Sequence, residues 1–185
     1  MSKRFTIAAA ALALSCASTA SIAASPGQVF INGSVGQSTY HDDFLNSSNT
    51  DTAVAGRVGY AWNVDQLSYG VEVGYADLGQ GRGDYGTYRL SSGVRGPLAG
   101  ANLTYRFPSR MFVHFRLGWM HDNFHGQLNG YRENFSGNGG YVGVGVGYDV
   151  NEHVGIGVAY DHYAVRGQGY RDSVGMLSGL VQFRF

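Results

Sequence analysis

The sequence predicts an all-β protein, an eight-stranded antiparallel up-and-down transmembrane β-barrel. Three observations lead to this fold class. Segments in which apolar residues alternate with polar or small ones recur along the chain, and the links between them are alternately short and long. The composition is also rich in glycine and aromatic residues, with 29 Gly, 13 Tyr and 10 Phe among 185 residues. Such a composition favours strands over helices.

Residues 1–24 are expected to be a cleaved signal peptide. The segment begins with the positive residues Lys3 and Arg4, continues with a short apolar run, and ends with small residues that permit cleavage after Ala23 or Ala24. A helix that spans a membrane needs about 20 predominantly apolar residues, and this run is shorter. We therefore leave the segment out of the fold.

Residues 25–185 are expected to form the barrel domain, and their composition excludes several kinds of site. They carry 11 arginines against 13 acidic residues, a net charge of −2, with no basic cluster that would bind nucleic acid. The single cysteine, Cys16, lies in the predicted signal peptide, so no disulfide, cysteine metal site or cysteine nucleophile is available. We expect no cofactor, no metal and no catalytic residue.

The alternating segments are interpreted as strands, because successive side chains of a strand point to opposite faces. In chain order, residues 29–35 alternate least regularly. The next three segments place Val, Tyr, Leu and Trp on one face and Gly, Asn, Arg and Glu on the other. The later segments are the clearest, with His, Arg, Gly and Asp opposite a face of Val, Phe, Leu, Tyr and Trp. The strands are expected at 29–35, 53–62, 69–75, 101–107, 111–119, 142–150, 154–160 and 175–185.

The links decide between a soluble sandwich, whose packed core would also produce alternation, and a membrane barrel. Short links are expected at 63–66, 108–110 and 151–153, and long loops at 40–51, 79–95, 121–139 and 163–172. All the long loops then fall on one side, as they do in outer-membrane barrels. Aromatic residues near both ends of the strands match the two interfacial belts of such barrels. These residues are Trp62, Phe107, Tyr148 and Phe185 near the short links, and Tyr75, Trp119 and Tyr160 near the long loops.

Charged residues on the polar face are expected to line the lumen as a structural network or as a gate. Eight strands enclose an interior that side chains just fill, so a charge there must pair or contact water. Glycines on two strands are expected to leave room for water, which predicts a partly hydrated lumen that conducts weakly at most. The predicted network is Arg57, Glu72, Arg106, Arg116, Asp161 and Arg184, with Asp149 and His114 on the same face; the glycines are Gly143, Gly145, Gly147, Gly155 and Gly157.

Two motifs in the expected loops have more than one interpretation. Residues 121–125, HDNFH, offer residue types that suit a metal site or an acid–base pair, but no nucleophile signature accompanies them, so an ordinary polar rim is favoured. Arg82, Gly83 and Asp84 spell a cell-attachment tripeptide, which also arises by chance. Loops on a rigid scaffold are a common place for binding functions, so a host molecule, a phage or lipopolysaccharide is a possible ligand.

Several short segments resemble the transmembrane domain of OmpA and its small eight-stranded outer-membrane relatives, including OmpX. Residues 70–79, GVEVGYADLG, are similar to the third strand of that family. Further similar segments are 103–106, 116–118, 145–148, and 175–179 with the terminal 183–185, which match its fourth, fifth, sixth and eighth strands. The resemblance implies a location in the outer membrane of a Gram-negative bacterium. The lumen of that family holds a Glu/Arg/Lys gate; Glu72 and Arg106 match two of its positions, while Gly147 and Gly157 occupy others.

The resemblance also implies partners and a function. The terminal Phe183 and Phe185 correspond to an assembly signal that the barrel-assembly machinery reads, and periplasmic chaperones are expected to escort the chain. OmpA continues into a periplasmic peptidoglycan-binding domain; this sequence stops at the barrel, so no cell-wall tether is expected. We expect a structural outer-membrane protein, not an enzyme, that supports envelope integrity, contacts lipid and lipopolysaccharide, and interacts through its external loops. A narrow gated channel is the alternative, and a lipid A-modifying enzyme is a more distant one.

Overall fold

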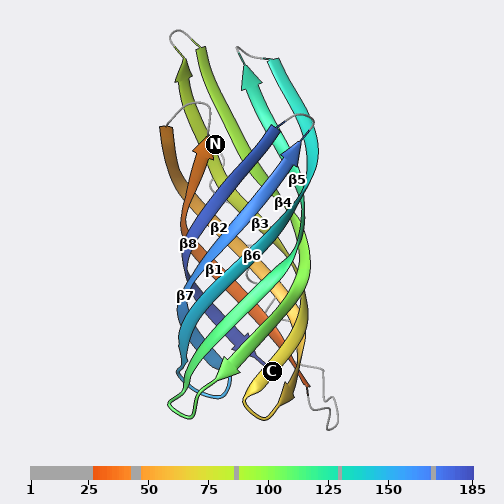
Figure 1. The fold of residues 1–185 in the computed structure, drawn as a ribbon, viewed down its shortest axis with the longest axis vertical. Coiled ribbons are helices and arrows are strands. Elements are labelled where there is room, and N and C mark those ends of the chain that lie inside the picture. The colour runs from red at the N-terminus through yellow and green to blue at the C-terminus, as the bar shows by residue number, and fades with distance from the viewer. Residues whose placement is uncertain (1–26, 43–46, 86–87, 129–130, 168–169) are drawn as a thin grey trace, which may run out of the picture.

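The computed structural model describes residues 27–42, 47–85, 88–128, 131–167 and 170–185. Within these residues, eight strands close into a barrel in chain order, with β1 beside β8 (Figure 1). All neighbouring pairs are antiparallel, which confirms the predicted fold class. The predicted signal peptide lies outside the described residues. The strands are β1 (Gly27–Asp42), β2 (Ser47–Val64), β3 (Leu67–Tyr85), β4 (Tyr88–Arg106), β5 (Met111–Leu128), β6 (Tyr131–Asp149), β7 (Val154–Gly167) and β8 (Tyr170–Arg184).

Strand parity determines which side chains face outward and which fill the lumen. On β6, Val144 is 42% exposed, whereas the glycines on either side of it are buried. The irregular first strand follows the same rule, because Phe30 is buried and Val35 is exposed. The outer face is therefore an almost continuous apolar surface, which suits lipid. Among the described residues, no helix has the length and apolar character needed to cross a membrane.

The short links are tight turns, as predicted. The backbone N–H of Phe107 donates to the carbonyl of Met111 at 2.8 Å, and the N–H of Val150 donates to the carbonyl of Val154 at 2.9 Å. Asn151 closes its turn from the side chain, since Oδ1 accepts from two backbone N–H groups, each at 2.8 Å. Asn is favoured in turns for this reason.

The predicted long loops are wrong, because strand pairing continues through most of them. The register runs on to Asp42↔Ser47, Tyr85↔Tyr88, Leu128↔Tyr131 and Gly167↔Tyr170. The cause of the error is physical: alternation marks a strand only where its two faces meet different environments. The extensions have no such alternation in their sequence, although their backbones remain paired.

The strand extensions differ in length, and four of them form a projecting sheet. Pairing of β4 with β5 continues to Leu90↔Leu128, and so joins the two tallest hairpins, β3–β4 and β5–β6 (Figure 1). The register of β6 with β7, in contrast, begins only at Gly140↔Ala164, and that of β2 with β3 at Val54↔Asp77. We call residues 80–85, 88–93, 121–128 and 131–139 of these hairpins the projecting sheet. Within the described residues, β3 and β6 form its two edges.

Candidate functional site

Four of the predicted lumen charges meet in a central cluster formed by Arg57, Glu72, Arg116 and Asp161. Arg57 Nε lies 3.5 Å from Glu72 Oε1, and Arg57 Nη2 lies 3.9 Å from Asp161 Oδ2. Arg116 Nε lies 2.7 Å from Asp161 Oδ1. Each of the four residues is at most 5% exposed. The two positive and two negative charges balance, as buried charges must if their desolvation is to be offset.

Neutral side chains add hydrogen bonds to Glu72 and Arg57 of the central cluster. Tyr141 OH donates to Glu72 Oε1 at 2.9 Å, and Asn102 Nδ2 donates to Glu72 Oε2 at 3.0 Å. Arg57 Nη2 donates to Tyr163 OH at 2.9 Å. The two tyrosine rings stack with centroids 5.8 Å apart. The sequence prediction missed these three neutral partners, although each shares the strand parity of the charges.

A second group of charges, the turn-end cluster, lies at the end of the barrel that carries the short turns, where β4, β6 and β8 end. Asp149 Oδ1 accepts a hydrogen bond from Arg184 Nη1 at 2.6 Å, and Asp149 Oδ2 lies 3.2 Å from Arg106 Nε. Arg106 Nη1 also donates to Ser68 Oγ at 2.7 Å. Arg184 donates to the backbone carbonyls of Asn151 and Glu152, both at 3.1 Å. This cluster ties the last strand to the adjacent turn.

The two residues that match gate positions belong to different clusters. Glu72 bonds to Arg57, Tyr141 and Asn102 in the central cluster. Arg106 bonds to Asp149 and Ser68 in the turn-end cluster. Glu72 is therefore paired with Arg57, whereas Arg106, the arginine at the other matching gate position, is paired with Asp149.

Side chains fill the space beside the inward glycines of β6 and β7, where water was expected. We call these glycines, Gly143, Gly145, Gly147, Gly155 and Gly157, the glycine wall. In the register of β5 with β6, Arg116 lies opposite Gly143, His114 opposite Gly145 and Phe112 opposite Gly147. A Cβ at Gly143 would collide with Asp161 and Arg116, and one at Gly145 would collide with the His114 ring. Likewise, a Cβ at Gly155 or Gly157 would collide with a neighbouring side chain or carbonyl. Large residues of one strand thus occupy the space that glycines of the next leave free.

The outer half of the lumen is apolar, which the sequence analysis did not foresee. Its buried side chains pack together above the tyrosine pair, and Leu78, Val174 and Met176 are completely buried. Ser38 Oγ and Tyr40 OH donate to the carbonyl of Leu78, at 2.6 and 2.9 Å. We call this group the apolar plug. Its members are Tyr40, Ala53, Ala55, Ala76, Leu78, Val94, Leu98, Met120, Tyr141, Tyr163, Val174 and Met176.

The remaining predicted residues lie outside these clusters or at their edge. His114 is buried beside Phe112, with ring centroids 6.1 Å apart. His121 is half-buried, and its Nδ1 lies 2.8 Å from Asn138 Oδ1; the side chains of residues 122–125 lie outside the described part of the structure. The backbone of Arg82, Gly83 and Asp84 belongs to β3, but their side chains are likewise not described.

The two terminal aromatic residues lie on the outer surface. Phe183 pairs with Ile31 and Val154, and its side chain is exposed. The N–H of Phe185 donates to the carbonyl of Val29 at 2.9 Å. Both residues therefore lie at the seam where β8 closes on β1. No group of three or more His, Cys, Asp or Glu side chains that could hold a metal occurs in the described part of the chain.

A closed barrel with an apolar outer face and charges turned inward defines a transmembrane β-barrel of the outer-membrane class. The chain belongs to the family described as outer membrane protein beta-barrel domain, whose model matches residues 7–185. The predicted location in the outer membrane and the resemblance to small outer-membrane barrels are thereby confirmed.

Solved structures of small outer-membrane barrels have the same fold. Ail of Yersinia pestis matches with a TM-score of 0.63 and 14% identity, over 87% of this chain and all of Ail. Neisserial surface protein A matches with a TM-score of 0.56 and 16% identity, over 85% of this chain and 97% of its own. The N-terminal barrel of Pseudomonas aeruginosa OprF matches with a TM-score of 0.52 and 18% identity, over 86% of this chain and 99% of the OprF barrel. No curated protein sequence matches the chain significantly.

Proposed function

We propose that the protein is a structural outer-membrane barrel that supports envelope integrity and holds the projecting sheet outside the membrane for contact with extracellular molecules. The observation that carries this proposal is the continuous pairing from β3 to β6 beyond the barrel. Paired strands hold a binding surface more rigidly than separate loops do. The surface ligand is therefore expected on the projecting sheet.

The edges of the projecting sheet favour an extended partner. Residues 131–139 of β6 pair with β5, and their other side has no β7 partner in the described register. Exposed edges offer unpaired backbone N–H and C=O groups, to which an extended peptide adds as a further strand. An anionic polysaccharide is a second probe, because a structure of Ail is described in complex with the heparin analogue sucrose octasulfate.

The interior supports a structural role more than a channel. The central cluster links β2, β3, β5 and β7 through its ion pairs, and the turn-end cluster links β4, β6 and β8. Such cross-links stiffen the barrel. The apolar plug then occupies the outer half of the same lumen with side chains that give ions no favourable contact.

One experiment tests the structural role and the surface-binding role separately. Residues 81–92 are replaced by an Asn-Gly turn that joins Gln80 to Gly93, which already pair. Cells that carry the full or the trimmed chain are compared for binding of fluorescent heparin and of unfolded peptide, and for exclusion of a large dye. The trimmed chain should keep dye exclusion and heat-modifiable gel mobility but lose surface binding. Unchanged binding would contradict the surface role, and normal dye exclusion in cells without the gene would contradict the structural one.

Two alternatives remain as competing hypotheses. A narrow gated channel draws its support from Arg57, which lies between Glu72 and Asp161 and so has two carboxylate partners. A lipid A-modifying enzyme has less support, because the polar contact of His121 is with an amide, Asn138. A change in lipid A acylation in a His121→Ala variant would favour the enzyme, and a stable conductance would favour the channel.

A further inference from the structure

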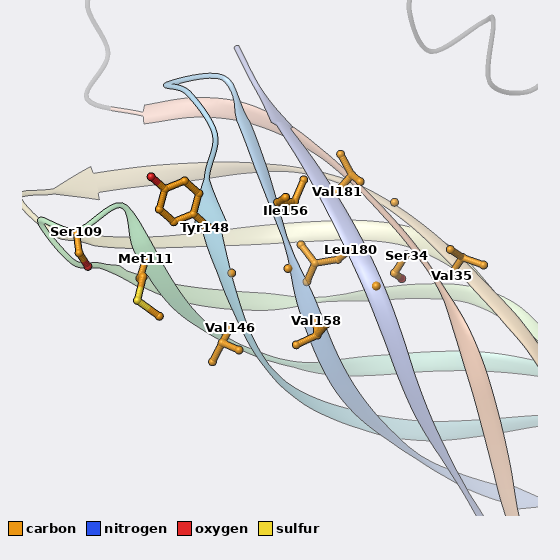
Figure 2. Close-up of a pocket in the computed structure, with 14 residues that line it drawn as sticks. Ser34, Val35, Ser109, Met111, Val146, Tyr148, Ile156, Val158, Leu180 and Val181 are labelled. Atoms are coloured by element: carbon orange, nitrogen blue, oxygen red, sulfur yellow. The ribbon is translucent and has the colours of Figure 1, made fainter.

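A groove of about 1020 Å³ crosses the outer surface of the barrel from the start of β5 to β1 (Figure 2). The groove runs across the strands, parallel to the rows of residues that are paired between neighbouring strands. One wall is the row that runs from Met111 through Tyr148, Ile156 and Val181 to Gly33. The neighbouring row, from Val146 to Val35, forms the other wall. The groove therefore lies in the pleat between two adjacent rows of outward side chains.

Two outward glycines deepen the groove where β8 meets β1. A Cβ added at Gly33 would have no heavy atom within 4 Å, and one at Gly179 would meet only the carbonyl of Val35 at 3.9 Å. Val35 and Val181, which stand beside these glycines, are both exposed. The missing side chains leave a hollow between valines on a surface that is otherwise convex.

The other end of the groove reaches the β4–β5 turn. Ser109 and Met111 line it there, and the exposed Arg110 lies between them in the β4–β5 turn. Tyr148 also lines this end, which is the level at which aromatic rings meet lipid headgroups. No acidic or basic residue is among those that line the groove, so the charge at this end comes from Arg110 beside it. This end therefore matches a phosphate in charge, and the rest of the groove matches a hydrocarbon chain.

The length of the groove fits one lipid leaflet. From β5 to β1 it crosses four strand-to-strand spacings, which amount to about 19 Å at ~4.8 Å each. Strands of such barrels tilt by about 35–45°, so a path along the register rises by roughly 11–13 Å. Half of a hydrocarbon core ~30 Å thick is about 15 Å. A chain that enters at the short-turn side would end close to the bilayer midplane.

We propose that this groove binds one acyl chain of an anionic phospholipid from the periplasmic leaflet, whose phosphate contacts Arg110 and Ser109. The partner is a single lipid held at a defined place on the barrel, and this binding is independent of what the projecting sheet binds. A second copy of the chain is the other occupant that an apolar surface could accept. The charge at the groove end favours the lipid.

The test uses the full chain refolded into vesicles of phosphatidylglycerol and phosphatidylcholine, followed by native mass spectrometry after extraction. The variants Gly33→Leu and Gly179→Leu fill the groove. Gly56→Leu is the matched control, because Gly56 pairs with Gly33, also faces outward with nothing within 4 Å of an added Cβ, and does not line the groove. We expect one retained phosphatidylglycerol in the parent and in Gly56→Leu, and about tenfold less retention in the two filled variants.

A second comparison addresses the headgroup. Arg110→Gln should remove the preference for phosphatidylglycerol over phosphatidylcholine, whereas Arg95→Gln, at an exposed arginine on the far side of the membrane, should keep it. Equal lipid retention in Gly33→Leu and Gly56→Leu would overturn the proposal. A dimer of the parent chain that Gly33→Leu abolishes would also overturn it, since the groove would then belong to a second copy.

Discussion

At the scale of single residues, Tyr141 joins the two halves of the lumen. Its ring packs in the apolar plug and lies against Gly100 and Gly118, while its hydroxyl donates to Glu72 Oε1. Tyr141→Phe keeps the ring and removes one donor from a buried carboxylate. Because hydrogen bonds to charged groups contribute about 1.5–3 kcal/mol, the free energy of unfolding should fall by that order. Urea unfolding in vesicles measures it, and Tyr148→Phe, whose ring faces lipid, serves as the control.

The glycine wall gives a second prediction at this scale. Gly143→Ala should force Arg116 and Asp161 apart, and overpacking of this kind costs about 1–3 kcal/mol. Gly56→Ala is the matched control, since its added methyl points into open space on the outer face. The same urea titration compares the two variants. Equal stability of both would mean that the side chains opposite Gly143 can move aside without loss.

At the scale of the strand, the assignment of faces can be tested on β6. Val144 pairs with Phe115 and Tyr160, in the middle of the outward surface. An arginine there would place its charge near the bilayer midplane, at a cost of about 2–4 kcal/mol, whereas near the interface the cost falls to about 0–1 kcal/mol. Val144→Arg should therefore lower urea stability and reduce the unheated gel shift. Val150→Arg, beside the short turn, should behave like the parent, and equal effects at both sites would refute the assignment.

Phe185, at the end of β8, is predicted to act in the assembly of the barrel. Phe185 is 56% exposed on the outer surface, and its N–H donates to the carbonyl of Val29 at the seam. We predict that deletion of Phe185 lowers the amount of inserted barrel in cells far more than it lowers the stability of refolded protein. Pulse-labelled insertion and urea unfolding measure the two quantities. Deletion of Gln37, an outward residue in mid-strand, should damage both, so a parallel loss for Phe185 would indicate a merely structural role.

The strands also show how far the sequence could predict the fold. Alternation such as that of Met111 to Trp119 identified every strand and its inward face, because lipid and lumen select different side chains. The same signal failed in the extensions, for example from His121 to Leu128, where the sequence does not alternate between apolar and polar residues. Strand ends outside the membrane depend on backbone pairing, which has no period in the sequence.

At the scale of the whole molecule, the inward charges were predictable as a set but their pairing was not. Parity places Arg57, Glu72 and Asp161 inside, but which of them meet depends on the stagger of the closed barrel. Closure brings Arg57 of β2 within 3.9 Å of Asp161 of β7, 104 positions along the chain. The separation of Arg106 from Glu72 has the same origin. Local sequence patterns do not contain that information.

The plug and the two charge clusters lead to a prediction for the complete barrel. In planar bilayers the purified protein should give no large, long-lived conductance, because apolar side chains occupy the outer half of the lumen and paired charges occupy the rest. Replacing Leu78, Met120 and Met176 by serine should introduce brief openings, since water and ions would meet polar groups there. Heat-modifiable gel mobility must show that the triple variant is folded. Large, stable openings of the parent protein would establish the channel hypothesis instead, and would require the central cluster around Arg57 to open as a gate.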